Sequence, residues 1–384
     1  MISLEEKIVG SIVGSALGDA LGSPLEKLSH DQIMQYYGKV DRLGVKKIRE
    51  TPTIPKKGNG YITDDTLMAL KICEIYSEKK EHLDAYDIFK LIDKIYYEKT
   101  WIPEFQINSP LIERLFYPEK YIFLSNYLAN RDPRSAGIGN MVNCGAMMYC
   151  GPIGLVNACD PFSAYKEAIS FASAHQWSYG LEAAGVFAAA VSAATIPDIT
   201  VDKIIEIAID LANDGTKMAI STLLKATREM DPIQDNANEL CQIVSNFTGI
   251  NNEFLRPHEI LGNPSESYAP SRKKSIEELP VALAYINIYK NEPYKALIEG
   301  INYGRDSDSI GATIGAIIGA QHGINIFPQN MLKELQEINA YNFIEIAKQF
   351  YQIVIKIQKK DFELLNLVQE MRRTLKEVKY HDSE

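Results

Sequence analysis

The feature that most constrains the fold is a pair of glycine runs, one near each end of the chain, in which a glycine recurs at every fourth position. The runs are Gly10, Gly14, Gly18, Gly22 and Gly311, Gly315, Gly319, Gly323. Residues four apart lie on one face of a helix, so each run predicts a helix with one face free of side chains. A glycine inside a helix costs up to about 1 kcal/mol relative to alanine. Close backbone packing would justify that cost, and we expect these two helices to be central and to pack against each other.

Apolar residues recur at helical spacing along most of the chain, and no stretch with a period of two persists. Helices are expected at 4–22, 65–80, 84–98, 146–150, 162–174, 178–194, 201–213, 216–229, 235–246, 276–290, 293–303, 309–321, 329–338, 342–357 and 360–377. Long loops are expected at 23–61 and 247–275, and the first of these could close over a site. No apolar run reaches about 18 residues, which argues against a membrane span. The predicted class is all-α.

Two acidic clusters each stand directly before an apolar helical pattern. The first is Thr63-Asp64-Asp65-Thr66 and the second is Asp306-Ser307-Asp308-Ser309. Either cluster alone would be read as a helix cap, because Asp, Ser and Thr accept hydrogen bonds from the free N–H groups at a helix start. Two such clusters instead suggest a shared site. Mg²⁺ takes oxygen ligands, and a two-metal hydrolytic site needs several carboxylates.

These motifs and four further blocks resemble the ADP-ribosylglycohydrolase family. The blocks are Gly14 to Glu26, Asn143-Cys144-Gly145-Ala146-Met147, Ala174-His175 and Glu277 to Leu283. They occur in the family's order and span roughly residues 10 to 320. The resemblance implies a compact many-helix fold. Because residues near 26, 64, 145, 175 and 306 would share one site, we expect a single domain over residues 1–384.

The resemblance also implies residue roles. Thr63, Asp64 and Asp65 would hold one Mg²⁺ ion and Asp306, Asp308 and Ser309 a second, with Mn²⁺ as a possible replacement. Glu26 and Asp65 would have catalytic roles, Glu26 by positioning or deprotonating a water. Substrate binding is expected at Asn143, Gly145, Ala146, Met147 and His175.

Ordinary structural roles stand beside these assignments. Glu26 could be a surface carboxylate at a helix end, His175 a satisfied core histidine, and the segment 134–151 an ordinary glycine-rich loop. Two departures from the family pattern concern the substrate. Met148 stands where an arginine often follows Gly-Ala-Met, and Arg305 precedes the second acidic motif.

The leading function is hydrolysis of an ADP-ribosyl or related ribosyl N- or O-glycosidic bond, on an ADP-ribosylated protein or a small ribosyl compound. A two-metal phosphoester hydrolase and a non-catalytic ADP-ribose-binding protein are the alternatives, because carboxylates alone do not separate them. The net charge of -10 gives no broad footprint for nucleic acid. The acidic opening Met1 to Lys7 and the five cysteines without zinc spacing lead us to expect a cytoplasmic protein with free thiols.

Overall fold

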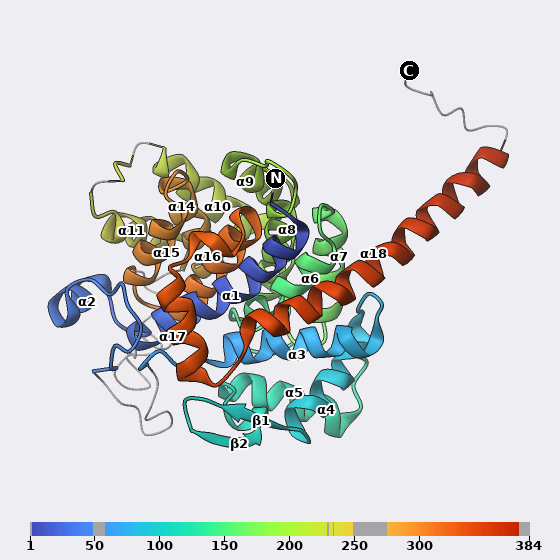
Figure 1. Ribbon diagram of the computed structural model, residues 1–384, viewed down its shortest axis with the longest axis horizontal. Helices are drawn as coiled ribbons and strands as arrows, with labels where there is room; N and C mark the ends of the chain where they lie inside the picture. Colours follow the sequence, from blue (N-terminus) through green and yellow to red (C-terminus); the bar gives the residue numbers. More distant parts are fainter. Residues whose placement is uncertain (1, 49–57, 229, 233, 249–274, 376–384) are drawn as a thin grey trace.

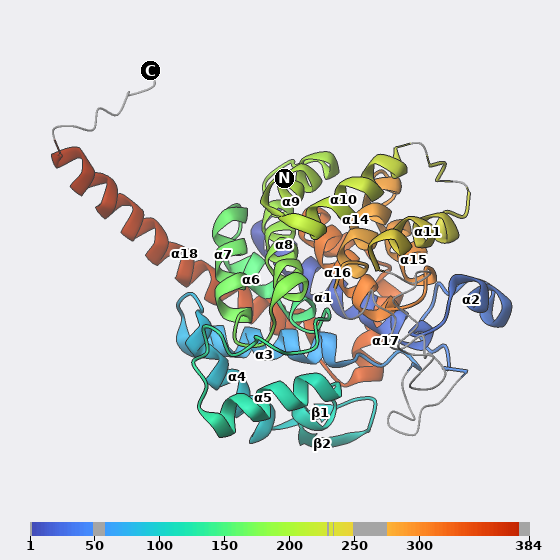
Figure 2. The same ribbon diagram turned by 180° about the vertical axis from the view of Figure 1, so that it is seen from behind.

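The computed structural model describes residues 2–48, 58–228, 230–232, 234–248 and 275–375, and they form an almost wholly helical protein (Figures 1 and 2). The helices are α1 (Leu4–Gly22), α2 (His30–Tyr37), α3 (Asp64–Lys79), α4 (Ile88–Tyr96), α5 (Tyr117–Ala129), α6 (Gly151–Val156), α7 (Pro161–Ala172), α8 (Ser178–Ala194), α9 (Val201–Leu211), α10 (Asp214–Thr227), α11 (Ala237–Thr248), α14 (Glu278–Ile288), α15 (Pro293–Asn302), α16 (Ser307–His322), α17 (Gln329–Asn339) and α18 (Phe343–Thr374). Short 3₁₀ helices include η1 (Ser23–Leu25), η2 (Ala85–Asp87), η3 (Leu111–Glu113), η4 (Met147–Tyr149) and η7 (Ile324–Ile326). The predicted all-α class is confirmed.

The two glycine-lined helices, α1 and α16, pack against each other at the centre of the molecule (Figure 1). Their backbones are so close that a Cβ atom built on Gly18 would lie 2.0 Å from the carbonyl oxygen of Gly311. In the same way, a Cβ on Gly14 would lie 2.4 Å from the oxygen of Gly315. No side chain fits at such distances, which is the physical reason for the glycine spacing. The predicted mutual packing is therefore confirmed.

Helix α1 begins where its sequence provides a complete cap. Ser3 Oγ accepts a hydrogen bond from the Glu6 N–H, and Glu6 Oε2 accepts one from the Ser3 N–H in return. The helix has the length and hydropathy of a candidate membrane span, but 94% of that window is buried inside the protein. Lys7 is buried as well, and its Nζ donates to the carbonyl oxygens of Ala194, Ala320 and Gln321, at the ends of α8 and α16. α1 is thus a core helix, and its Lys7 also satisfies backbone carbonyls at the C-terminal ends of α8 and α16.

Several elements differ from the expectation. Helix α2 lies inside the expected loop 23–61, and α5 lies where no helix was expected. A short antiparallel hairpin, β1 (Lys99–Ile102) with β2 (Ile107–Pro110), follows α4, where no strand was expected. The predicted helix 146–150 is the 3₁₀ turn η4, and the α-helix begins only at Gly151. The two helices expected at 342–357 and 360–377 form the single helix α18. Most of the expected loop 247–275 lies outside the described residues.

Candidate metal and substrate site

The start of α16 places three of the predicted ligands. Asp306 is the N-cap residue of the helix, but within the described chain its side chain makes no capping hydrogen bond to the helix N–H groups. Instead, Cys144 Sγ donates to Asp306 Oδ2 at 3.1 Å. Asp308 and Ser309 follow in the first turn, and both are buried. Capping therefore does not explain Asp306, and the helix N-terminus favours the negative charge gathered there.

The end of α1 brings Glu26 to the same place. η1 turns the chain after Gly22, and the following backbone is fixed to the segment before α16. Lys27 N–H donates to the Arg305 carbonyl at 2.7 Å, and Arg305 N–H donates to the Leu28 carbonyl at 2.6 Å. Glu26 is buried, and its Oε2 lies 3.8 Å from Lys47 Nζ. It is not the surface carboxylate of the alternative interpretation.

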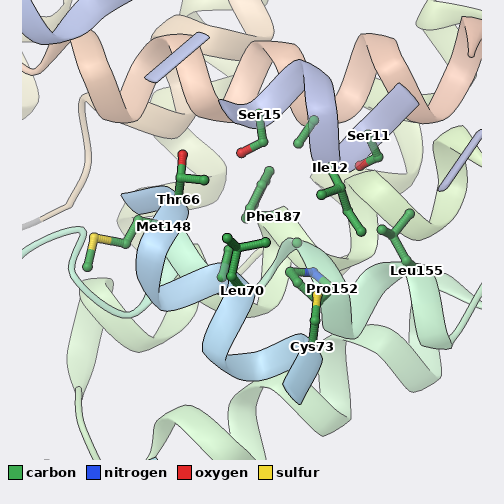
Figure 3. Close-up of a pocket in the computed structure, with 13 residues that line it drawn as sticks. Ser11, Ile12, Ser15, Thr66, Leu70, Cys73, Met148, Pro152, Leu155 and Phe187 are labelled. Carbon is green, nitrogen blue, oxygen red and sulfur yellow. The ribbon is translucent and has the colours of Figure 1, made fainter. Parts of the chain in front are cut away.

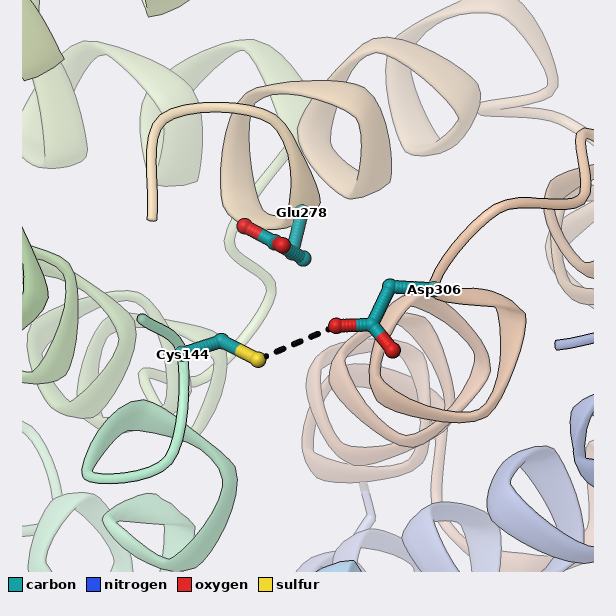
Figure 4. Close-up of side chains that lie close together, drawn as sticks. All are labelled: Cys144, Glu278 and Asp306. Carbon is teal, nitrogen blue, oxygen red and sulfur yellow. Dashed lines mark hydrogen bonds between the residues drawn. The ribbon is translucent and has the colours of Figure 1, made fainter. Parts of the chain in front are cut away.

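Two groups of metal-ligating side chains come together around Asp306. Oxygen atoms of Glu26, Asp306 and Asp308 lie within 4.8 Å of one another, and all three residues are buried. The second group joins Asp306 to Cys144 and Glu278, again within 4.8 Å (Figure 4). No role was predicted for Cys144 or Glu278 from the sequence. Both lie inside blocks that carried the family resemblance, but neither stands in one of the two acidic motifs.

The start of α3 is organised by Asp19 from α1. Asp19 Oδ2 accepts hydrogen bonds from the Thr63 N–H at 2.9 Å and from Thr66 Oγ1 at 2.5 Å. Thr63 is the N-cap, and its Oγ1 lies 3.3 Å from Asp65 Oδ2. Asp19 therefore positions the acidic motif through its backbone and hydroxyl groups, as a supporting residue.

Asp64 is held by a buried arginine that sequence analysis missed. Arg114 Nη1 lies 3.0 Å from Asp64 Oδ1, and Arg114 Nε also pairs with Glu104. All three residues are buried. Arg114 comes from the turn after η3, 50 residues from Asp64 in the chain, and no local pattern connects the two.

The carboxylates of α1, α3 and α16 repel one another. Burial, followed by the charge of Asp308, raises the pKa of Asp19 to about 7. Burial and repulsion by Asp308, followed by that of other nearby carboxylates, raise the pKa of Asp65 well above its ordinary value. Asp19 Oδ1 and Asp65 Oδ1 are buried and find no hydrogen-bond partner among the residues that the structure describes. Such oxygens fit the ligand preference of a hard divalent cation, which would neutralise this repulsion.

Hydrogen bonds of Asn143 with Glu119 and Gln176 hold the predicted substrate loop in place. Asn143 Nδ2 donates to Glu119 Oε1 at 2.8 Å, and Asn143 Oδ1 accepts from Gly145 N–H and Gln176 Nε2. A Cβ on Gly145 would lie 2.6 Å from Glu119 Oε1 and 2.9 Å from Asn143 Oδ1, so a larger residue would have to displace these side chains. Ala146 and Met147, the remaining predicted loop residues, are fully buried. Their substrate contacts stay predictions.

His175 is buried among aromatic rings. Its Nδ1 lies 2.8 Å from the Tyr149 hydroxyl, and its ring lies 4.5 Å from that of Phe123, measured between centroids. Its exposed fraction is 0%. This position favours the structural alternative, in which His175 supports the loop. Direct contact with a substrate stays a prediction.

Arg305 is engaged with a neighbour rather than pointing to open solvent. Its Nε pairs with Glu277, whose Oε1 also accepts from the Tyr303 hydroxyl at 2.7 Å. The Arg305 backbone has a positive φ of 59°. This turn directs the chain into Asp306 and the first turn of α16.

A small cavity lies in the core between α1, α3, α6 and α8 (Figure 3). Its lining is mostly apolar and includes Ile12, Leu70, Met148 and Phe187. The cavity has a volume of about 20 Å³, which is room for roughly one water molecule. It is too small for a nucleotide and is not the substrate site.

Comparisons with known proteins place the sequence in a family. A family model described as ADP-ribosylglycohydrolase matches residues 1–361. "Uncharacterized protein YegU" from Escherichia coli (strain K12) is 25% identical over 344 residues, covering 89% of this chain and 95% of its own length. A solved structure described as an ADP-ribosylglycohydrolase-related protein complex covers 91% of this chain and 99% of its own, with 18% identity and a TM-score of 0.49.

The all-α fold, the buried acidic site and the family match together define a hydrolase of the glycohydrolase class. The chain belongs to the ADP-ribosylglycohydrolase family.

Proposed function

We propose that the protein is a divalent-metal-dependent hydrolase that cleaves an ADP-ribosyl or related ribosyl N- or O-glycosidic bond. The observation that carries the proposal is the convergence of Glu26, Asp306 and Asp308 within 4.8 Å in a buried site. Family membership favours glycosidic over phosphoester cleavage, since paired carboxylates serve both reactions. The substrate would be an ADP-ribosylated protein or a small ADP-ribosyl or ribosyl compound.

The oxygens of the two acidic motifs would hold two Mg²⁺ ions, or Mn²⁺ in their place. The residues are Thr63, Asp64, Asp65, Asp306, Asp308 and Ser309. Support comes from the buried, mutually repelling carboxylates and from the unsatisfied Asp65 Oδ1. A bound divalent cation supplies Lewis-acid stabilisation of negative charge on oxygen.

The chain's own carboxylates fit the charge that develops in glycosidic cleavage. The transition state resembles an oxocarbenium ion, so positive charge appears at the ribose. Asp65, whose Oδ1 has no hydrogen-bond partner among the described residues, would stabilise that charge. Glu26 comes from a different element and would accept a proton from the attacking water, with Lys47 as its ion-pair partner.

Product analysis tests the proposal. The purified protein is incubated with Mg²⁺ or Mn²⁺ and with defined ADP-ribosyl proteins, free ADP-ribosyl compounds and phosphoesters, and products are identified by mass. We expect release of ADP-ribose or a ribosyl product, and its loss when the metal is chelated. Release of phosphate or a nucleoside monophosphate would instead identify a phosphoester hydrolase, and binding of ADP-ribose without turnover of any substrate would identify a binding protein.

A further inference from the structure

The C-terminal helix α18 leaves the body of the protein part-way along its length. Its first half packs on α1, α3 and α6, while its second half projects away from the other helices in both views (Figures 1 and 2). At the point of departure, Asp361 Oδ2 lies 3.0 Å from His82 Nε2. The family model also ends at residue 361. The projecting half is thus an addition to the part that carries the site.

One apolar stripe runs through both halves in a single register. The buried residues of the first half are spaced alternately four and three apart, and they are Phe343, Ala347, Phe350, Val354 and Ile357. The same alternation continues through Asp361 into the projecting half, at Leu364, Val368 and Met371, and reaches Leu375, the residue directly after the last helical residue Thr374. This is the a and d pattern of a coiled coil, in which the stripe faces another helix.

In the projecting half, the stripe lies open to solvent. Leu364 is 60% exposed, Met371 52% and Leu375 59%. Leu365 and Leu367 flank the stripe and widen it, and both are more than half exposed. So many exposed apolar side chains on one helix face mark an interaction surface.

The polar side of the projecting half helps to identify the partner. It carries both signs of charge, at Glu363, Glu370, Arg372 and Arg373. A helix that lies on a membrane has a strongly cationic polar face, which this mixture does not provide. The stripe therefore suits a protein helix with the same a and d spacing.

We propose that the occupant is the projecting half of α18 from a second copy of this chain, so that the protein forms an antiparallel coiled-coil dimer. The spacing of the four stripe residues is four, three, four, which reads the same in both directions. An antiparallel copy therefore places Leu364 beside Leu375 of the other copy and Val368 beside Met371, as the mixed a and d layers of such a pair require. The antiparallel direction also keeps the two bodies at opposite ends of the shared coil.

The test measures molar mass of the full chain by light scattering and sedimentation over a wide range of protein concentration. We expect reversible dimers for the parent. Leu364→Lys and Met371→Lys should remain monomeric, with unchanged thermal unfolding of the body. Phe362→Ser is the matched control, because Phe362 is 65% exposed but lies on the opposite face of the same helix, and this variant should dimerise like the parent.

Three results would overturn the proposal. A parent chain that stays monomeric at all concentrations has no such interface, whether or not it binds lipid vesicles. Dimers that persist in both lysine variants use another surface. Loss of dimers in Phe362→Ser would show that general apolarity, and not the register of the stripe, drives association.

Discussion

Glu26 reaches the acidic site from the end of α1, although it belongs to neither acidic motif. Its carboxylate lies within 4.8 Å of those of Asp306 and Asp308, which is near enough to act on a water or substrate at the site. Glu26→Gln keeps the shape and removes the charge. We expect turnover of an accepted substrate to fall by about 10²-fold, the scale of a positioned acid or base.

Calorimetric titration with Mg²⁺ is the companion measurement for Glu26→Gln. Metal affinity close to that of the parent, together with slow turnover, would support the catalytic role. A parent-like rate would contradict it, and loss of metal binding would move Glu26 among the metal ligands.

Asp308 is the main charged neighbour that raises the pKa of both Asp19 and Asp65. Its replacement by asparagine removes a repelling charge and a proposed metal ligand together. We therefore expect Asp308→Asn to be more stable than the parent in chelator, by roughly 1 kcal/mol, and to gain less stability when Mg²⁺ is added. Thermal unfolding with and without Mg²⁺ measures both effects.

The exposed Glu370→Gln on α18 provides a control for removal of one negative charge far from the site. This variant should have the same thermal stability as the parent both with and without Mg²⁺. Asp308 is not a metal ligand if Asp308→Asn is less stable than the parent in chelator and gains as much stability as the parent when Mg²⁺ is added.

Site residues that stand in short sequence motifs could be predicted from the sequence. Site residues contributed by distant segments of the chain could not. Glu26, Asp306 and Asp308 were predicted and do converge. Arg114 and Lys47 were missed, because an ion pair between residues far apart leaves no periodic or local signal. Tertiary packing alone brings these cations to the carboxylates.

At the scale of the elements, the contact between α1 and α16 depends on the absence of Cβ atoms. A Cβ on Gly18 would meet the Gly311 carbonyl oxygen at 2.0 Å and force the two helices apart. We expect Gly18→Ala to lose about 3 kcal/mol of unfolding free energy, despite the better helix propensity of alanine. Denaturant unfolding monitored by circular dichroism measures the loss.

Ser15→Ala is the matched control in the same helix. Ser15 faces the small cavity rather than the glycine contact, and its Cβ is already accommodated (Figure 3). This variant should stay within about 1 kcal/mol of the parent, as substitutions that create no clash usually do. Equal losses of unfolding free energy in the two variants would mean that any substitution in α1 is destabilising. The loss in Gly18→Ala could then not be attributed to the glycine contact.

His82 links helix α18 to the body of the protein, because its ring contacts Glu167 of α7 on one side and Asp361 of α18 on the other. The hydrogen bond with Glu167 raises the pKa of His82 to about 9 from an ordinary value of 6.5. A raised histidine pKa stabilises the folded protein fully below about pH 6.5, and this contribution is lost as the pH rises through about 9. His82 is partly exposed, so we expect a contribution on the order of 1 kcal/mol.

Unfolding free energies measured from pH 6 to pH 10 for the parent and for His82→Gln test this pH dependence. The stability difference between the two proteins should shrink as the pH rises. A constant difference across this range would show that His82 is not protonated in the folded protein.

The positions of most long helices could be predicted from the periodicity of apolar residues. The points at which helices end or continue, and the short elements between them, could not. The break expected near residue 358 is absent, because the register of the stripe passes through this part of α18 without interruption. The β1–β2 hairpin was missed because its strands are four residues long, too short for a period of two to show.

At the scale of the whole molecule, residues from the two ends of the chain build one site. Glu26 and Asp306 contribute to the same group of ligands, and the glycine face of α1 packs against the glycine face of α16. We therefore propose that residues 1–384 form a single domain. A fragment of residues 1–200 should neither unfold cooperatively nor bind Mg²⁺ tightly, as heat denaturation and calorimetry would show.

A fragment of residues 1–200 that folds and keeps activity would contradict the single-domain proposal. The full chain, heated under the same conditions, serves as the control and should show one transition.

The glycine contact also sets an order of events during synthesis. Ser307 Oγ donates to the Gly22 carbonyl across 285 residues of chain. At about 5 to 20 residues per second, α1 waits roughly 15 to 60 s on the ribosome before its partner helix has been made. During that interval, its glycine face lacks the helix that covers it in the folded protein. A helix that is mostly buried in the finished protein is therefore one that the growing chain must shelter until nearly all of the chain has been made.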